Sequence, residues 1–218
     1  MAEVALAPCV YVLAGVNGAG RSSIAGAAFR SRGAEYFNPD EAARAIARFS
    51  PNLTQERANA AAWARGRRLL ERAIAEKLSF AFETTLGGDT IPSLLGQALG
   101  SGIEVRVWYA GLASPELHIA RVRARVAAGG HDIPEAKIRE RYDRSRSNLV
   151  KLLPHLTELR VYDNSRDADP RAGLMPEPLL LVHMARGCVV SSCELKLVPE
   201  WAKPILAVAL EARSPEAG

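Results

Sequence analysis

The residues best suited to chemistry lie in one glycine-rich stretch, Gly15 to Ser23, which reads GVNGAGRSS. The apolar run 9–14 before it is typical of a buried strand, and the residues after it can form a helix. Glycines in such a turn let several backbone N–H groups point inward, and the following helix adds its positive end. The stretch therefore predicts a phosphate-binding loop, in which the hydroxyl of Ser22 would coordinate Mg²⁺.

The cation of this stretch departs from the usual pattern G-x-x-x-x-G-K-[ST], because Arg21 stands where lysine is expected. Arginine keeps the charge, but its side chain is longer, planar and forked, so it does not place a compact ammonium between two phosphates. Nucleotide binding is expected, and the rate of any catalysis stays open. The alternative is an ordinary glycine-rich turn with an exposed arginine.

Carboxylates suited to act on a hydroxyl group occur at two later positions. Asp40 follows Asn38, which is expected to cap a helix, and an acid in a first helical turn is favourable simply because it faces the helix dipole. Glu83 and Thr84 end the apolar run 79–85, and ligands of open parallel sheets bind beyond the carboxyl ends of strands. Position therefore favours a functional Glu83, whereas spacing alone favours a structural Asp40.

Arginines gather on two consecutive predicted helices. Arg121 and Arg125 are four residues apart and so are neighbours on one helical face, where they repel unless an anion or a carboxylate lies between them. The next predicted helix, 135–153, carries Arg139 and Arg141. Two such helices joined by a glycine-containing hinge would form a mobile lid over phosphates, and solvated side chains are the alternative.

The order of elements predicts an α/β fold. Strands are expected at 9–14, 35–37, 79–85, 103–112 and 159–162, with helices between them. This alternation predicts a parallel sheet with helices on both faces. A hairpin at 179–184 and 187–192 and a helix at 201–211 are expected to form a small extension. We therefore expect a domain over 1–165 and a C-terminal extension, 166–218, packed on it.

Composition sets broad limits. The 218 residues are 48% apolar and 24% charged, which fits one domain, and the net charge of +4 suits anionic small molecules as well as nucleic acid. No apolar run approaches the roughly 18–20 residues of a membrane span, and the start of the chain lacks the basic residues of a signal peptide. The cysteines, Cys9, Cys188 and Cys193, lack metal-ligand spacing. We expect a cytoplasmic protein with reduced thiols that binds neither membrane nor nucleic acid.

Taken together, these segments resemble the zeta-toxin-like P-loop kinases, the family with toxins that phosphorylate UDP-N-acetylglucosamine. The similar segments are AGVNGAG at 14–20, NPD at 38–40, FETT at 82–85, SPEL at 114–117, RV at 121–122 and 125–126, GGHDIP at 129–134, IR at 138–139, RY at 141–142, NL at 148–149 and VYDNS at 161–165. They cover about residues 8–165 in the family's order.

The resemblance implies a role for each segment. Asp40 would be the base that takes the proton from the acceptor hydroxyl, which overturns its structural interpretation, and Arg21, Arg125 and Arg141 would be catalytic cations. The residues implied to bind ATP are Gly15, Val16, Asn17, Gly18, Ala19, Gly20, Arg21, Ser22, Ser23, Arg121 and Arg139. The acceptor would be bound by Asn38, Glu83, Thr84 and His131. ATP and Mg²⁺ are the implied cofactors, with Ser22 as the metal ligand, and an antitoxin is an implied partner.

Three functions stay open. The first is ATP-dependent phosphorylation of a hydroxyl on a nucleotide sugar such as UDP-N-acetylglucosamine. The second is phosphorylation of another small molecule, such as an antibiotic or a nucleoside. The third, motivated by Arg21, is nucleotide binding with weak or no kinase activity.

Overall fold

The computed structural model describes residues 7–21, 24, 35–50, 52–130, 132–166 and 177–212. The strands are β1 (Cys9–Ala14), β2 (Glu35–Phe37), β3 (Phe80–Thr84), β4 (Glu104–Gly111), β5 (Glu158–Asp163), β6 (Leu179–Ala185) and β7 (Cys188–Ser192). The helices are α2 (Pro39–Phe49), α3 (Gln55–Ala75), α4 (Thr90–Gly100), α5 (Pro115–Ala127), α6 (Glu135–Leu152) and α7 (Lys203–Glu211). The helix expected after the glycine-rich stretch lies outside the described residues, apart from Ile24.

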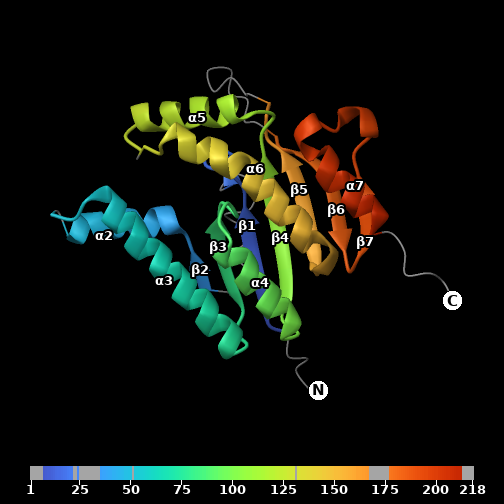
Figure 1. Cartoon of the computed structure of the whole chain (residues 1–218), viewed down its shortest axis with the longest axis horizontal. Helices are drawn as coiled ribbons and strands as arrows, with labels where there is room; N and C mark the ends of the chain where they lie inside the picture. The colour runs from blue at the N-terminus through green and yellow to red at the C-terminus, as the bar shows by residue number, and fades with distance from the viewer. Residues whose placement is uncertain are drawn as a thin grey trace.

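The strands form one seven-stranded sheet in the order β2-β3-β1-β4-β5-β6-β7 (Figure 1). The first five strands of that order are parallel to their neighbours, as the alternation of elements predicts. The other two are antiparallel, so the expected hairpin is confirmed and extends the same sheet. Its tight turn is Arg186-Gly187, and both residues have positive φ (49° and 75°), which matches the twist of the strands it joins.

The main core lies between the sheet and the helices α3, α4, α6 and α7, which Figure 1 shows in front of the strands. Alternate residues of β1 face this core, namely Val10, Val12 and Ala14. Leu13 faces the opposite side, where a smaller apolar cluster has Ile24 packed against it. Burial on both faces explains why the strand sequences read as continuous apolar runs.

The topology determines where a ligand is expected to bind. The chain passes from β1 to β2 and β3 on one side and then to β4 and β5 on the other, so β1 lies at the point where the strand order reverses. In open parallel sheets ligands bind beyond the carboxyl ends of the strands at such a point. The glycine-rich loop directly follows β1, and α5 and the start of α6 lie near the same end of the sheet (Figure 1).

None of the described helices combines the length and the apolar character needed to cross a membrane.

Candidate functional site

The glycine-rich loop has a backbone that requires its glycines. Gly15, Gly18 and Gly20 have φ values of 141°, 85° and 76°, a region that other residues rarely adopt. A Cβ atom at Gly15 would lie 2.3 Å from the carbonyl oxygen of Ala110, and one at Gly18 would lie 2.8 Å from that of His118. The loop is therefore tightly curled and pressed against both β4 and α5.

Three side chains bind the carbonyl groups of alternate loop residues. Nδ1 of His118 lies 2.8 Å from the carbonyl oxygen of Asn17, and Nδ2 of Asn164 donates to that of Ala19 at 2.9 Å. The guanidinium of Arg21 donates to the carbonyl of the glycine that opens the loop. These contacts hold the curled backbone of the loop in place, and a fixed, curled run of backbone amides is what an anion-binding loop requires. This arrangement fits a bound phosphate.

His118 was missed by sequence reasoning. Its side chain is 1% exposed, and burial lowers its pKa from 6.5 to about 4, against the opposing effect of its hydrogen bond with Asn17. The ring is therefore neutral at pH 7, and we assign its proton to Nδ1, which then donates to the loop. Its position four residues before Val122, on the apolar stripe of α5, was the available signal.

Arg21 and Glu83 form an ion pair at the base of the site. Nε of Arg21 lies 3.1 Å from Oε2 of Glu83, and their side chains are 11% and 3% exposed. The exposed arginine that the alternative of an ordinary turn predicts is therefore wrong. Glu83 also accepts hydrogen bonds from Nδ2 of Asn38 at 3.0 Å and from the hydroxyl of Tyr36. Three donors thus surround this buried carboxylate.

Asn38 joins the ion pair to the helix that carries Asp40. While its Nδ2 donates to Glu83, its Oδ1 accepts hydrogen bonds from the backbone N–H groups of Asp40 at 2.9 Å and Glu41 at 3.2 Å. The expected N-cap of α2 is therefore confirmed. A continuous chain of polar contacts leads from Arg21 on the loop to the first turn of α2.

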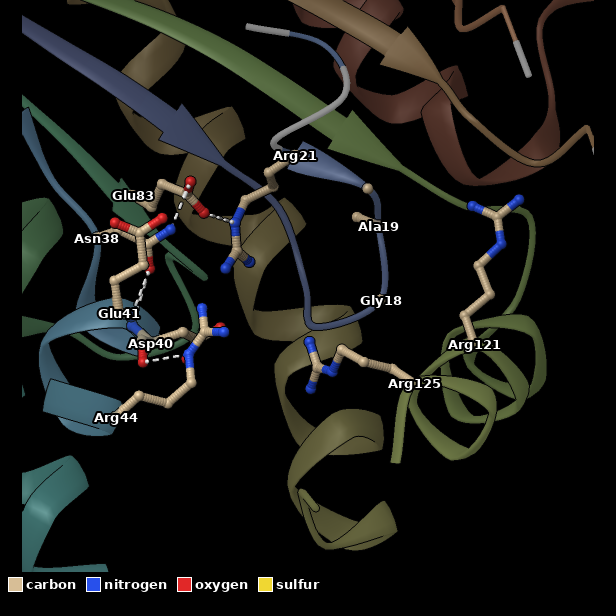
Figure 2. Close-up of a pocket in the computed structure, with 11 residues that line it drawn as sticks. Gly18, Ala19, Arg21, Asn38, Asp40, Glu41, Arg44, Glu83, Arg121 and Arg125 are labelled. Carbon is tan, nitrogen blue, oxygen red and sulfur yellow. Dashed lines mark hydrogen bonds and ion pairs between the residues drawn. The ribbon is translucent and has the colours of Figure 1, made fainter. Parts of the chain in front are cut away.

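These groups line one cavity of about 340 Å³, a size typical of sites for small ligands. Figure 2 shows the lining residues, which are Gly18, Ala19, Gly20, Arg21, Asn38, Asp40, Glu41, Arg44, Glu83, Arg121 and Arg125. The structure thus brings together nine of the eighteen residues singled out from sequence. Glu41 and Arg44 were missed, although Arg44 follows Asp40 by four residues and so shares its helical face.

Several other predicted residues do not line the cavity. Arg141 donates to Oδ1 of Asn17 at 2.8 Å, behind the loop, and burial lowers the pKa of its guanidinium. Arg139 instead pairs with Glu116 at 2.6 Å, joining α6 to α5. Oγ1 of Thr84 accepts a hydrogen bond from the backbone N–H of Leu86. Arg139 and Thr84 thus form contacts with other protein groups and do not line the cavity.

Gly15, Val16 and Asn17 belong to the loop but do not line the cavity. Val16 is buried in an apolar cluster with residues of α5 and α6, including Ile119, Val122 and Ile138. Ser22, Ser23 and His131 lie outside the described residues. The expected Mg²⁺ ligand therefore stays a prediction. Within the described ranges, no group of three or more His, Cys, Asp or Glu residues is arranged to hold a metal ion.

Comparison with known proteins supports the resemblance found in the sequence. The profile of a family described as Zeta toxin matches residues 2–169. The chain belongs to this family. A curated relative, an uncharacterised protein of Haemophilus influenzae, is 36% identical over 74 residues, which are 34% of this chain and 53% of the relative. The chain thus spans about half the length of that relative.

Solved structures share the fold at low sequence identity. The AvrRxo1-ORF1:ORF2 complex matches 94% of this chain and 71% of the other, with a TM-score of 0.67 and 16% identity. Its ATP-bound form has a TM-score of 0.65 at 16% identity and matches 97% and 66% of the two chains. A structure from the PezAT chromosomal toxin-antitoxin system of Streptococcus pneumoniae matches 80% and 76%, with a TM-score of 0.53 and 17% identity. The expected α/β fold of P-loop kinases is confirmed.

Proposed function

We propose that this protein is a kinase that transfers the γ-phosphoryl group of ATP to a hydroxyl of a small acceptor. The acceptor expected from the family is a nucleotide sugar such as UDP-N-acetylglucosamine. The observation that carries the proposal is the single cavity in which the glycine loop, the arginines and Asp40 meet. Phosphoryl transfer depends mainly on positioning and charge stabilisation, and these are the properties such a cavity supplies.

The triphosphate would bind along the glycine loop. Arg121 and Arg125 reach the same cavity from α5, and Arg141 lies behind the loop against Asn17. Together they would neutralise the charge of the phosphates as the reaction proceeds. Mg²⁺, held by the hydroxyl of Ser22, would supply further positive charge beside the phosphates.

Asp40 would act as the base. The acceptor hydroxyl oxygen attacks the γ-phosphorus and forms the new P–O bond, its proton passes to a carboxylate oxygen of Asp40, and the bond to ADP breaks. The capping contacts of Asn38 fix the first turn of α2, so they would hold the backbone from which this carboxylate projects.

Arg21 would hold the γ-phosphate with the part of its guanidinium that faces the cavity in Figure 2. Its Nε and Nη1 are engaged by Glu83 and by the loop, so the fork is held in a fixed direction. Glu83 would then position Arg21 and Asn38 rather than contact the acceptor directly.

The same ion pair favours a second candidate function. Since Glu83 offsets the charge of Arg21, less positive charge is available to the phosphates than a free lysine would offer. A nucleotide-binding protein with slow or absent transfer would fit this geometry and would act through a protein partner. We propose an antitoxin as that partner. This proposal is supported by the family and by the toxin-antitoxin system named for one structural neighbour.

The experiment that separates these functions measures ADP formation with Mg-ATP and UDP-N-acetylglucosamine for the wild type and Asp40→Asn. We expect the substitution to lower kcat by about 100-fold or more, the usual contribution of a positioned base, while calorimetry shows unchanged ATP binding. Glu56→Gln, an exposed acid in the first turn of α3, is the matched control. Equal turnover for wild type and Asp40→Asn would remove Asp40 from its role, and binding of ATP without turnover would favour the second function.

A further inference from the structure

The cavity contains one arginine that the mechanism above does not use. Arg44 lies one turn after Asp40 on α2 and lines the cavity from that side. Figure 2 shows its guanidinium directed into the cavity rather than along the helix. Residues four apart on a helix share a face and are separated by a rise of about 6 Å.

The charges of the cavity are divided between its two sides. Arg21 and Glu83 offset each other in their ion pair. Arg121 and Arg125 approach from α5, next to the loop (Figure 2). Arg44 is the cation that α2 contributes, on the side of the candidate base.

The contacts of Arg44 leave most of its guanidinium available. Its Nε donates to the backbone carbonyl of Asp40 at 3.3 Å, which holds the side chain against its own helix. In the part of the chain that the structure describes, no carboxylate forms an ion pair with Arg44. Other arginines that are ion-paired include Arg106, Arg139 and Arg144. The Nη groups of Arg44 are therefore free to form charge-assisted hydrogen bonds with a ligand.

Exposure separates Arg44 from the reaction centre. Glu83 is buried and Asp40 is half-buried, whereas Arg44 and Glu41 are exposed. Phosphoryl transfer takes place where water is excluded, so the exposed mouth of the cavity suits the outer part of the acceptor better than the transferred group. An acceptor with its hydroxyl at Asp40 would extend past Arg44 toward the solvent.

We infer that Arg44 selects acceptors that carry an anionic group, a phosphate or diphosphate, about one helical turn from the hydroxyl that is phosphorylated. This inference rests on the proposed kinase function and narrows its substrate class. Arg44 is a specificity-determining residue in this account, and Glu41 opposes it because its carboxylate repels the same anion.

The test uses calorimetry on the full chain with three probes that differ in charge. AMP-PNP with Mg²⁺ reports the nucleotide site. N-acetylglucosamine 1-phosphate and uncharged N-acetylglucosamine, each added with and without AMP-PNP, report the acceptor site. The variants are Arg44→Gln, Glu41→Gln and the matched control Arg48→Gln, which removes the same charge from the exposed last turn of α2, outside the cavity lining.

We expect the wild type to bind the phosphorylated sugar more tightly than the uncharged one. Arg44→Gln should weaken binding of the phosphorylated sugar by roughly ten- to hundred-fold, the usual loss for a charge-assisted hydrogen bond. Glu41→Gln should strengthen it, and Arg48→Gln should weaken it much less than Arg44→Gln does, because Arg48 is exposed and lies outside the cavity lining, where solvent and salt screen its charge. The Kd of AMP-PNP should stay the same in all variants.

Three results would overturn the inference. The first is equal binding of the two sugars, or binding of neither, by the wild type. The second is an equal loss for Arg44→Gln and Arg48→Gln, which would indicate only a general charge effect. The third is weaker AMP-PNP binding by Arg44→Gln, which would make Arg44 a nucleotide ligand. Failure of the wild type to bind AMP-PNP would instead refute the proposed kinase function, and the sugars without nucleotide would still report on Arg44.

Discussion

Mild acid is expected to destabilise the fold through one buried side chain, His118. Burial lowers the pKa of this histidine from 6.5 to about 4, and the nearby Arg121 and Arg21 add to the lowering. In the unfolded chain the ring takes up a proton as the pH falls through about 6.5, whereas in the folded chain it does so only near pH 4. The unfolded state therefore binds more protons across this window.

The sign and size of the effect follow from that difference. The contribution of His118 to stability is complete above pH 6.5 and is lost as the pH falls toward 4. The loss is about 2 kcal/mol at pH 5 and about 3 kcal/mol once both states are protonated. For a domain whose total stability is typically about 5–15 kcal/mol, this is a substantial fraction.

The assay is urea unfolding followed by circular dichroism at several pH values between 7.5 and 5. His118→Gln is the informative variant, because its side-chain amide can still donate to the carbonyl of Asn17 but does not titrate. Carboxylates that titrate over this range are present in both proteins, so the difference between the two curves isolates His118. Parallel curves for wild type and His118→Gln would refute the reasoning.

Three further substitutions test the loop and its connection to α2. Gly18→Ala should weaken AMP-PNP binding at least ten-fold and cost about 1–3 kcal/mol in urea unfolding, because its φ is +85° and its Cβ would meet the carbonyl of His118. Unchanged affinity would mean that the loop tolerates the shift. Arg21→Lys should lower the free energy of unfolding by about 1–3 kcal/mol, because a lysine does not reproduce the Nε contact with the buried Glu83. If Arg21→Lys raised kcat several-fold, the arginine would slow phosphoryl transfer relative to a lysine. An unchanged kcat would reject the hypothesis that Arg21 slows the transfer. Asn38→Ala should cost about 2 kcal/mol, from the lost cap and the lost bond to Glu83, and should lower kcat without changing the Kd of ATP. If Asn38→Ala weakened ATP binding and left kcat unchanged, this prediction would be wrong.

The order of elements was predictable because the local signals agree with one another. The N-caps Asn38 and Ser114, each followed by proline, mark the starts of α2 and α5, and both side chains accept the expected backbone hydrogen bonds. The apolar runs are long enough to identify strands that are buried on both faces. The carboxyl ends of β1 and β3 then had to meet at one edge of a parallel sheet.

The contacts within the site depend on residues far apart in sequence, so sequence spacing did not reveal them. Glu83 was expected to face a ligand, but its partners Arg21, Asn38 and Tyr36 lie more than 40 positions away. Asn164 was part of the recognised segments without a role, and it donates to a loop carbonyl 145 positions earlier. Helical spacing identifies which arginines share a face of a helix. It does not show which of them form an ion pair with a carboxylate of another helix, as Arg139 does with Glu116.

The apolar cluster beneath the loop limits how this site can open. Val16 is buried together with Ile119 and Val122 of α5 and Ile133 and Ile138 beside it, so the loop and the two arginine-bearing helices share one hydrophobic contact. Lifting those helices off the loop would expose several of these side chains, at a cost of roughly 1.5–3 kcal/mol for each one fully uncovered. Substrates would therefore enter more easily from the side of α2, where Glu41 and Arg44 are exposed at the edge of the cavity.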